Sequence, residues 1–417
     1  MRKLSCMKVM QFVYWGEVML KNKVVVVGVT GSIAAYKSAQ LVSDLVKEGC
    51  EVHVIMTKNA VNFINPITFE TLTGRKCLVD TFDRNFEYSV THVSLSQKAD
   101  VFMIAPASAN IIGKIANGIA DDMLSTMVMA AKCPVLIAPA MNKYMFMNSI
   151  VQENIEKLKR HGYKIISPAV GRLACNDTGI GKLPDVDVLM EHIRHEIANK
   201  KDFQGKRVLV TAGPTQESLD PVRYITNHST GKMGYAMAQA ASERGAEVTL
   251  ISGEVNIKPS IFVQLVKVKS AEDMFNAVKE NLSESDVLIM SAAVADYTPD
   301  TYSSQKIKKH DDDMSISLKR TADILKYAGE HKKESQVICG FSMETENLVA
   351  NSRKKLETKN CDMIAANSIK EKGAGFGTDT NIITLITRDD IYELRIMSKY
   401  EAANVILDKI KQIFSMN

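Results

Sequence analysis

Residues 23–37 read KVVVVGVTGSIAAYK, and this stretch decides the fold class of the N-terminal half. A β-branched run ends at Thr30, and apolar residues then recur at helical spacing as far as Lys47. A second β-branched run follows at 51–56. A strand, a helix and another strand in this order predict a parallel sheet with a crossover helix.

The same plan recurs in the C-terminal half. Residues 207–211 predict a strand, 231–244 a helix and 247–252 the next strand. Near the end, two alternating segments at 381–387 and 391–397 predict an antiparallel hairpin, before a final helix. We therefore expect an α/β protein with two Rossmann-like parallel-sheet domains. Further buried strands are expected at 100–105, 134–138, 163–166, 286–291, 336–340 and 362–366.

Length and composition narrow the class of protein. A chain of 417 residues allows two or three domains, and 46% apolar with 24% charged residues is typical of a globular protein. Lys and Arg number 52 against 48 Asp and Glu, a balance that argues against a dedicated nucleic-acid binder. No apolar run approaches the ~20 residues that a membrane helix needs. We therefore expect small-molecule ligands.

The cysteines indicate the compartment. They are scattered, and none forms a C-x-x-C pair, so we expect reduced thiols in the cytoplasm and no zinc site. The seven are Cys6, Cys50, Cys77, Cys133, Cys175, Cys339 and Cys361.

The first 18 residues do not read as a signal peptide. Their apolar stretch is broken by Glu17, and no small-residue cleavage site follows it. The codons of residues 16–18 would resemble a bacterial ribosome-binding site directly before Met19. We therefore expect translation to start at Met19 and residues 1–18 to be a mis-called extension.

Several turns of the first half follow strands, where open α/β sheets bind their ligands. The turn 30–33 opens a helix, so its backbone N–H groups could cradle a phosphate, but it lacks the third glycine of a dinucleotide fingerprint. Segments 105–110 and 138–142 carry small residues that would suit a flat cofactor. Each of these segments also reads as an ordinary strand-end turn.

Two further residues carry possible chemistry. His92 precedes the strand expected at 100–105, and a lone histidine is more often structural than catalytic. Cys175 lies in a glycine-rich polar loop, 171–181, where a thiol could serve as a general acid.

Taken together, these segments resemble the flavin-dependent cysteine decarboxylases. The matching elements are GVTGSIAAYK (28–37), His92, APASAN (105–110), PAMN (139–142) and LAC (173–175). This family decarboxylates 4′-phosphopantothenoylcysteine with FMN. The resemblance therefore implies a flavodoxin-like FMN domain over residues 19–198.

The resemblance also implies residue roles. His92 would be the base that assists oxidation of the substrate thiol by FMN, Asn142 would hold the departing carboxylate, and Cys175 would protonate the enethiolate. Asn176 departs from the usual pattern, which has glycine after the cysteine. Residues implied near the FMN phosphate or the flavin ring are Gly31, Ser32, Ile33, Thr57, Ser108 and Ser125.

The second half carries its own motifs. Gly231-Lys232 is not a P-loop, because Thr226 replaces the first glycine and Met233 the metal-binding hydroxyl. Lys355 and Lys359 are four apart on an expected helix, so they could grip a triphosphate or form a solvent face. Lys306 begins a basic run that also reads as a solvated loop.

With the polar segment 222–234 and the strand-end segment 291–297, these motifs resemble phosphopantothenate–cysteine ligase over residues 207–417, with 199–206 as a linker. The family's fused type uses CTP and Mg²⁺ to form an acyl-cytidylate, from which cysteine displaces CMP. Asn227 would process that intermediate, and Arg223 would hold the substrate. The implied CTP contacts are Ala292, Ala293, Asp296, Lys306, Asp323, Phe341, Lys355 and Lys359.

The two resemblances imply a bifunctional, cytoplasmic enzyme of coenzyme A biosynthesis. The loop of Lys306 reaches across a dimer in the ligase family, and trimers of decarboxylase domains with dimers of ligase domains imply a homo-oligomer, a dodecamer. Two alternatives are a related flavin enzyme, acting on a peptide C-terminal cysteine or a prenylated flavin, and a non-enzymatic binding protein. The presence of all five expected catalytic residues argues against the latter: His92, Asn142, Cys175, Asn227 and Lys306.

Overall fold

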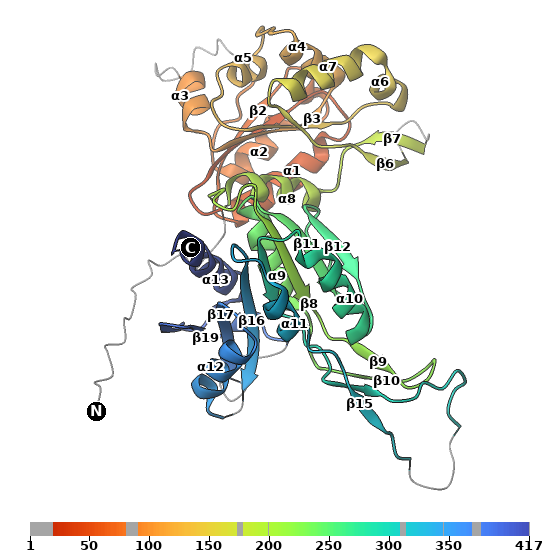
Figure 1. The fold of residues 1–417 in the computed structure, drawn as a ribbon. Coiled ribbons are helices and arrows are strands. Elements are labelled where there is room, and N and C mark those ends of the chain that lie inside the picture. The colour runs from red at the N-terminus through yellow and green to blue at the C-terminus, as the bar shows by residue number, and fades with distance from the viewer. Residues whose placement is uncertain are drawn as a thin grey trace. The chain divides into compact units, whose positions relative to one another are not determined.

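The chain forms two compact units whose boundary falls between residues 199 and 200 (Figure 1). Residues 1–19, on which the expected start at Met19 depends, lie outside the described part. The computed structural model describes residues 20–80, 91–172, 178–198, 200–308, 314–344, 346–368 and 377–416.

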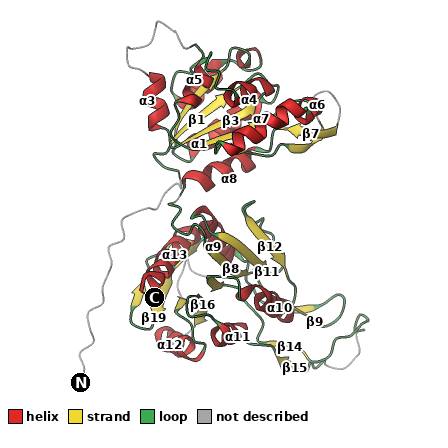
Figure 2. Ribbon diagram, turned by 45° about the horizontal axis from the view of Figure 1, so that its top comes forward, coloured by secondary structure: helices red, strands yellow, loops and turns green. Residues whose placement is uncertain are grey.

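The first unit contains a five-stranded, wholly parallel sheet in the order β2-β1-β3-β4-β5. Helices cover both faces of this sheet (Figure 2), which is why its strands are continuous apolar runs. Its strands are β1 (Val24–Val29), β2 (Glu51–Met56), β3 (Val101–Ala107), β4 (Val135–Pro139) and β5 (Lys164–Ile165).

Alternate residues of β1 enter two separate cores. Val25 and Val27 pack with α1 and α8, whereas Val24 and Val26 pack with α4, α5 and α7 on the other face. The helices of this unit are α1 (Ala35–Lys47), α2 (Pro66–Thr73), α3 (Thr91–Lys98), α4 (Ala109–Ala116), α5 (Met123–Met129), α6 (Lys143–Met147), α7 (Ser149–Arg160) and α8 (Val186–Ile197), with a 3₁₀ turn η1 (Ala60–Asn62).

The second unit contains an eight-stranded mixed sheet in the order β12-β11-β8-β13-β16-β17-β19-β20. The first six of these strands are parallel, and the expected late hairpin is present because β19 pairs antiparallel with both β17 and β20. Its strands are β8 (Arg207–Ala212), β11 (Glu247–Ser252), β12 (Val263–Lys267), β13 (Val287–Met290), β16 (Val337–Glu344), β17 (Met363–Ser368), β19 (Ile383–Thr387) and β20 (Ile391–Glu393).

Helices again form two layers around this sheet. Val208 and Val210 pack with α9 and α13, and Leu209 packs on the opposite face with α10, α11 and α12. Cys339 and Cys361 are fully buried, as expected of core thiols. The helices are α9 (Lys232–Glu243), α10 (Ala271–Leu282), α11 (Ile324–His331), α12 (Leu348–Thr358) and α13 (Lys399–Met416).

Short paired strands that the sequence analysis missed form an arm on the second unit (Figure 1). Two to five residues give too little alternation to predict a strand. We call residues 216–226, 297–308 and 314–320 the arm; it contains β9 (Gln216–Ser218) with β10 (Tyr224–Thr226) and β14 (Tyr297–Pro299) with β15 (Leu318–Arg320). Other short pairs are β6 (Ala169–Arg172) with β7 (Thr178–Lys182), and β18 (Thr380–Asn381) with β21 (Met397–Ser398).

The segment expected to link the two halves is fastened to the second unit. Phe203 is buried, and its N–H donates to the carbonyl of Arg244 at 2.9 Å. The Arg244 guanidinium in turn donates two hydrogen bonds of 2.8 Å to the Asp202 carboxylate. Residues 202–206 are therefore a packed part of this unit, because an aromatic side chain and a bidentate ion pair hold them.

Across the described residues, no helix is both long and apolar enough to cross a bilayer.

Candidate active sites

In the first unit, the turns after β1 and β3 are joined by one hydroxyl. Thr30 Oγ1 donates to the carbonyl of Pro106 at 2.7 Å and accepts from the N–H of Ser108 at 2.9 Å. Because Thr30 is buried, this bridge fixes the backbone of both turns. It brings the expected phosphate turn, 31–33, beside Ser108.

The turn 31–33 leads directly into α1, and some of its N–H groups bond within the turn: Ser32 donates to the carbonyl of Thr30 at 2.8 Å, and Ala35 donates to the carbonyl of Ser32 at 3.0 Å. The N-cap residue of α1, Ala34, makes no side-chain capping bond. Gly31 passes so close to η1 that a Cβ there would lie 2.8 Å from the Cβ of Asn59. Glycine is therefore required at this point, and the nearby backbone N–H groups suit an anion.

Thr57 follows β2 at the same edge of the sheet, where its N–H donates to the carbonyl of Val29 at 3.0 Å. Its Oγ1 is buried and has no hydrogen-bond partner among the residues that the structure describes. A buried hydroxyl without a partner is unfavourable unless a ligand supplies one. The close glycine turn before α1 and this hydroxyl both fit a phosphorylated flavin with polar ring atoms.

The two serines expected at the flavin differ in their surroundings. Ser108 is the N-cap of α4 and accepts from the N–H of Ile111 at 3.5 Å. Ser125 is fully buried in a capping box, where its hydroxyl donates to Asp122 Oδ1 at 2.9 Å. Burial alone would raise the pKa of Asp122, but hydrogen bonds from Lys114 and Ser125 lower it. Contact of Ser125 with a flavin remains a prediction.

Asn142 lies at the end of β4 and caps α6, accepting from the N–H of Tyr144 at 2.8 Å. Its neighbour Met141 donates to the carbonyl of Gly181 at 3.0 Å. Gly181 has φ of 132°, and a Cβ there would lie 2.3 Å from the Met141 carbonyl oxygen. The hairpin of β6 and β7 is thus held against the start of α6, beside Asn142.

The remaining two candidates of this site are only partly located. Cys175 belongs to residues 173–177, between β6 and β7, which lie outside the described residues. His92 lies in the first turn of α3, and its side chain lies outside the described part.

In the second unit, the loop after β13 is held by three hydroxyl groups. Thr211 Oγ1 accepts from the N–H of Ala292 at 3.2 Å, and Thr215 Oγ1 accepts from the N–H of Ala295 at 3.0 Å. Thr321 Oγ1 donates to the carbonyl of Ala295 at 2.7 Å. Asp296 follows in the same loop. These threonines were not expected as site residues, although Thr211 ends a β-branched segment.

Asn227 meets this loop directly. Its Nδ2 donates to the carbonyl of Ala293 at 3.0 Å, and the N–H of Ala293 donates to the carbonyl of Gly213 at 2.9 Å. The structure therefore brings together Asn227 and Ala293, which are 66 positions apart in the chain.

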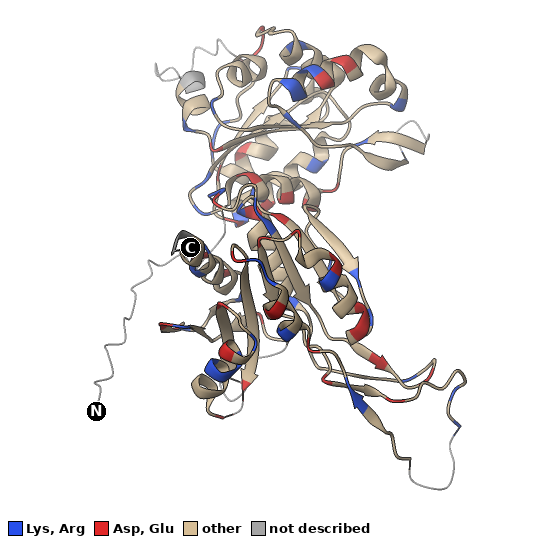
Figure 3. Ribbon diagram, in the orientation of Figure 1, with Lys and Arg blue, Asp and Glu red and all other residues tan. Residues whose placement is uncertain are grey.

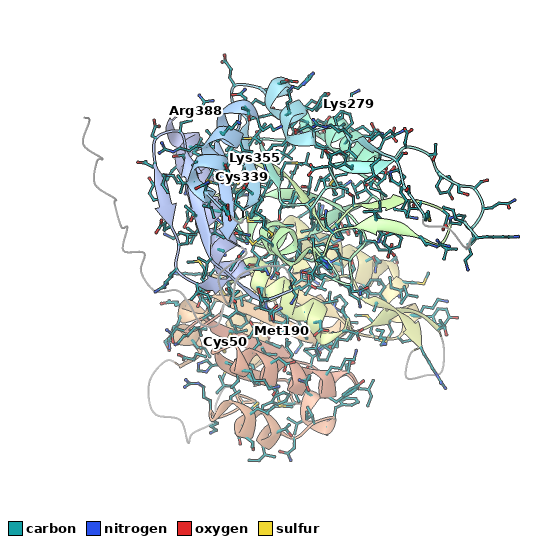
Figure 4. The ribbon with its side chains drawn as sticks, turned by 90° about the horizontal axis from the view of Figure 1, so that it is seen from below. Cys50, Met190, Lys279, Cys339, Lys355 and Arg388 are labelled. Carbon is teal, nitrogen blue, oxygen red and sulfur yellow. The ribbon has the colours of Figure 1, made fainter. Side chains whose placement is uncertain are left out.

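Next to this loop, two lysines of α12 face different acceptors. Lys355, labelled in Figure 4, donates from Nζ to the carbonyl of Phe341 at 2.9 Å, and burial lowers its pKa. Lys359, the C-cap residue, forms an ion pair with Asp323, the N-cap of α11. Burial would raise the pKa of Asp323, but the Lys359 ion pair and the N–H of Lys326 lower it.

The last two expected residues meet on the arm. Lys306 is exposed, and the next residue, Ile307, accepts a 2.6 Å hydrogen bond from the Arg223 guanidinium. The nearby β15 carries Lys319 and Arg320, which are blue in Figure 3. This end of the arm is therefore basic. Within the described residues, no group of three His, Cys, Asp or Glu side chains could hold a metal ion.

Two strand-end sites on two α/β units define a two-domain α/β enzyme with a flavoprotein half. The Flavoprotein family matches residues 16–198, and the DNA/pantothenate metabolism flavoprotein C-terminal domain family matches residues 203–414. The family resemblance and the α/β fold class are both confirmed.

Full-length relatives identify the family. The chain is 46% identical over 396 residues to the Coenzyme A biosynthesis bifunctional protein CoaBC of Bacillus subtilis (strain 168), covering 94% of this chain and 97% of that protein. The same protein of Vibrio parahaemolyticus is 40% identical, with coverage of 94% and 99%. A crystal structure of a CoaBC C-terminal domain is 42% identical and covers 52% of this chain and 100% of that domain, with a TM-score of 0.45. The chain belongs to the CoaBC family of bifunctional coenzyme A biosynthesis enzymes.

Proposed function

We propose that this chain makes 4′-phosphopantetheine from 4′-phosphopantothenate, cysteine and CTP in two steps. Residues 207–417 perform the ligation, and residues 19–198 decarboxylate the ligated product. The observation that carries this proposal is the pair of strand-end sites: an uncharged one that fits a flavin, and a lysine-bearing one that fits a nucleotide. Because all reactants are small metabolites, no nucleic acid or membrane takes part.

The ligation requires activation, because a carboxylate is a poor electrophile. The carboxylate of 4′-phosphopantothenate attacks the α-phosphorus of CTP, which releases pyrophosphate and leaves an acyl-cytidylate. The amine of cysteine then displaces CMP. Lys306, Lys355 and Lys359 neutralise the triphosphate, with Asp296, Asp323 and Phe341 placing the nucleotide. Ala292 and Ala293 contact CTP, and Asn227, which donates to the Ala293 carbonyl, processes the acyl-cytidylate. Arg223 binds the acid substrate.

Magnesium enters with the nucleotide. Mg²⁺ is commonly bound by substrate phosphates and one or two carboxylates, with water completing its shell. Such a site does not need a dedicated cluster of acidic residues.

The decarboxylation takes place at the first unit. FMN, when bound, supplies a reversible electron sink: the thiol carbon is oxidised before CO₂ leaves and reduced afterwards, so the net reaction is redox-neutral. Gly31, Ser32 and Ile33 would hold the phosphate of the FMN, and Thr57, Ser108 and Ser125 would contact the flavin. His92 removes a substrate proton, the Asn142 amide orients the carboxylate, and Cys175 donates a proton to the enethiolate.

Compartment and assembly complete the proposal. The described cysteines Cys50, Cys77, Cys133, Cys339 and Cys361 are free thiols, in keeping with a reducing cytoplasm. The exposed apolar residues near α1 and on the arm suit contacts between copies, as trimers and dimers within a dodecamer.

A product assay tests the proposed function. The purified chain, loaded with FMN, would receive 4′-phosphopantothenate, cysteine, CTP and Mg²⁺, and products would be identified by mass spectrometry. A mass for 4′-phosphopantetheine, absent when CTP is omitted, is the expected result. Accumulation of 4′-phosphopantothenoylcysteine alone would contradict the decarboxylase assignment. No product would favour a flavin enzyme for another cysteine-containing substrate, or a binding protein.

A further inference from the structure

The arm contains a buried carboxylate that the proposed chemistry does not use. Asp220 is 2% exposed. Its Oδ1 accepts from the backbone N–H groups of Val222 at 2.8 Å and Arg223 at 2.9 Å. Its Oδ2 accepts from the N–H of Ile307 at 3.1 Å, 87 positions along the chain. Burying a carboxylate is unfavourable unless such donors surround it, so this arrangement is specific.

The same contacts tie two segments of the arm together. The Arg223 guanidinium donates to the carbonyl of Ile307 at 2.6 Å, and its Nε lies 3.6 Å from Asp220 Oδ2. The same two segments are also joined by the N–H of Ser303, which donates to the carbonyl of Leu219 at 3.0 Å. Asp220 is at the centre of this set, because it accepts from both segments.

These hydrogen bonds, which we call the tie, hold the backbone beside Lys306 and Arg223, the two basic residues that the proposed ligase reaction needs. Ile307 directly follows Lys306, so its N–H is part of the peptide unit that leaves Lys306. Arg223 is held through both its N–H and its side chain. No residue of 219–223 or 303–307 belongs to the core clusters of this unit, so the tie is separate from the packing that stabilises the sheet.

We propose that Asp220 is a positioning residue for the ligase reaction. Its carboxylate fixes the relative placement of Lys306 and Arg223, so that the arm presents both positive charges together to the phosphates and carboxylate of the substrates. This inference rests on the proposed function, which assigns those substrates to Lys306 and Arg223.

The substitution Asp220→Asn separates this role from simple support of the turn. The Asn oxygen still accepts from Val222 and Arg223, whereas its NH₂ group would face the N–H of Ile307, another donor. We expect the ligase kcat/KM to fall by about 10- to 100-fold, as for a misplacement of about 1 Å. The fall should appear as slower acyl-cytidylate formation in single-turnover assays, with decarboxylation of supplied 4′-phosphopantothenoylcysteine unchanged.

Matched variants complete the test. Asp300→Asn removes an exposed carboxylate of the same arm, 3.9 Å from Lys319, and should leave the ligase rate unchanged. Asp220→Ala also removes the bonds within the turn. Impairment by Ala but not by Asn would overturn the proposal, because the turn alone would then matter. Loss of the unit's thermal transition in Asp220→Asn would also overturn it, because the carboxylate would then be needed for folding.

A double-mutant cycle tests whether Asp220 acts through Lys306. If it does, the loss in the double variant Asp220→Asn with Lys306→Gln should be clearly smaller than the product of the two single losses, and what Asp220→Asn still costs there reflects Arg223. Multiplied effects would contradict the proposal. An unimpaired Lys306→Gln variant would remove Lys306 from the proposed function and this role with it. An impaired Lys306→Gln beside a normal Asp220→Asn would overturn only the role of Asp220.

Discussion

The two units place their candidate sites at the same position of a similar sheet, yet line them with different chemistry. In the first unit the described candidates are uncharged, and they include a hydroxyl without a partner at Thr57. In the second unit they include Asp323 and Lys359, which form an ion pair. The strand-end edge therefore sets where a ligand binds, and the side chains select which ligand.

The two sites also differ in the contacts that their groups make before a ligand binds. The first site is preorganised by backbone ties, such as the Thr30 bridge between the turns after β1 and β3. The second site holds cationic groups that already have partners: Lys355 donates to the Phe341 carbonyl, and Lys359 forms an ion pair with Asp323. A triphosphate must compete with these partners, so the second site should be the more sensitive to salt.

The largest expected effect on one activity alone comes from placing a negative charge at Asn142. In Asn142→Asp, the side chain can still cap α6, because Asp is as good an N-cap as Asn. The new negative charge would repel the substrate carboxylate. We expect decarboxylation to fall by about 100-fold or more, the scale of a lost charge-stabilising contact, with ligation unchanged. Both rates would be measured on one preparation.

Asn148→Asp is the matched control, because Asn148 caps α7 in the same way, accepting from the N–H of Ile150 at 3.0 Å. It should leave both rates unchanged. Equal losses in the two variants would mean that Asn142 acts only as a cap.

Most of this architecture could be predicted from the sequence, because buried parallel strands leave an unmistakable apolar run. The segments 51–56 and 247–252 agree with β2 and β11 at both ends. The edge strand β12, the helix α3 and the paired strands of the arm were missed, and α3 has weak apolar periodicity while the arm strands have three residues each. Their structure depends on distant partners, such as Asp220 for Ile307.

The candidate sites were predictable as motifs but not as geometry. The spacing placed Lys355 and Lys359 on one helix, yet it could not show that they bind different acceptors. It included Thr30 in the phosphate turn but assigned no role to its hydroxyl, and it missed Thr211 and Thr215, whose hydroxyls also hold turns. A threonine at a strand end is common, and only the fold shows which backbone groups it reaches.

A smaller effect is expected at the nucleotide site. Lys355→Met keeps the length of the side chain and removes its charge. We expect the KM for CTP to rise by about 10- to 150-fold, the worth of a charge-assisted hydrogen bond of roughly 1.5–3 kcal/mol, with decarboxylation unchanged. Lys354→Met, at an exposed position of the same helix, should change KM little. Similar effects of both would indicate general attraction by the helix surface.

Substitution of Thr57 should have opposite effects on two quantities: the stability of the flavin-free unit should be kept or rise, and the affinity for flavin should fall. Thr57→Val removes a buried polar atom without a partner, so the flavin-free unit should be as stable or up to about 1 kcal/mol more stable. Flavin affinity should fall by about 5- to 10-fold, the worth of one net hydrogen bond. Thr71→Val, whose hydroxyl donates to the Ile67 carbonyl, should not change affinity. Unchanged affinity in Thr57→Val would place the flavin elsewhere.

The smallest effect concerns the ion pair of Asp323 with Lys359, which has no counterpart among the described candidates of the first site. The pKa of Asp323 is lowered in the folded protein, so its contribution to stability is present above the unfolded pKa and is lost as pH falls through the folded pKa. Because the side chain is 45% exposed, we expect less than about 1 kcal/mol. Asp323→Asn can still cap α11, so at pH 6 this variant should melt only slightly below the wild type. The difference in melting temperature should vanish in strong acid. It should also shrink in 0.5 M salt, because salt screens the attraction between the two exposed charges. A difference in melting temperature that persists in acid would show that the carboxylate stabilises α11 by its shape and not by its charge.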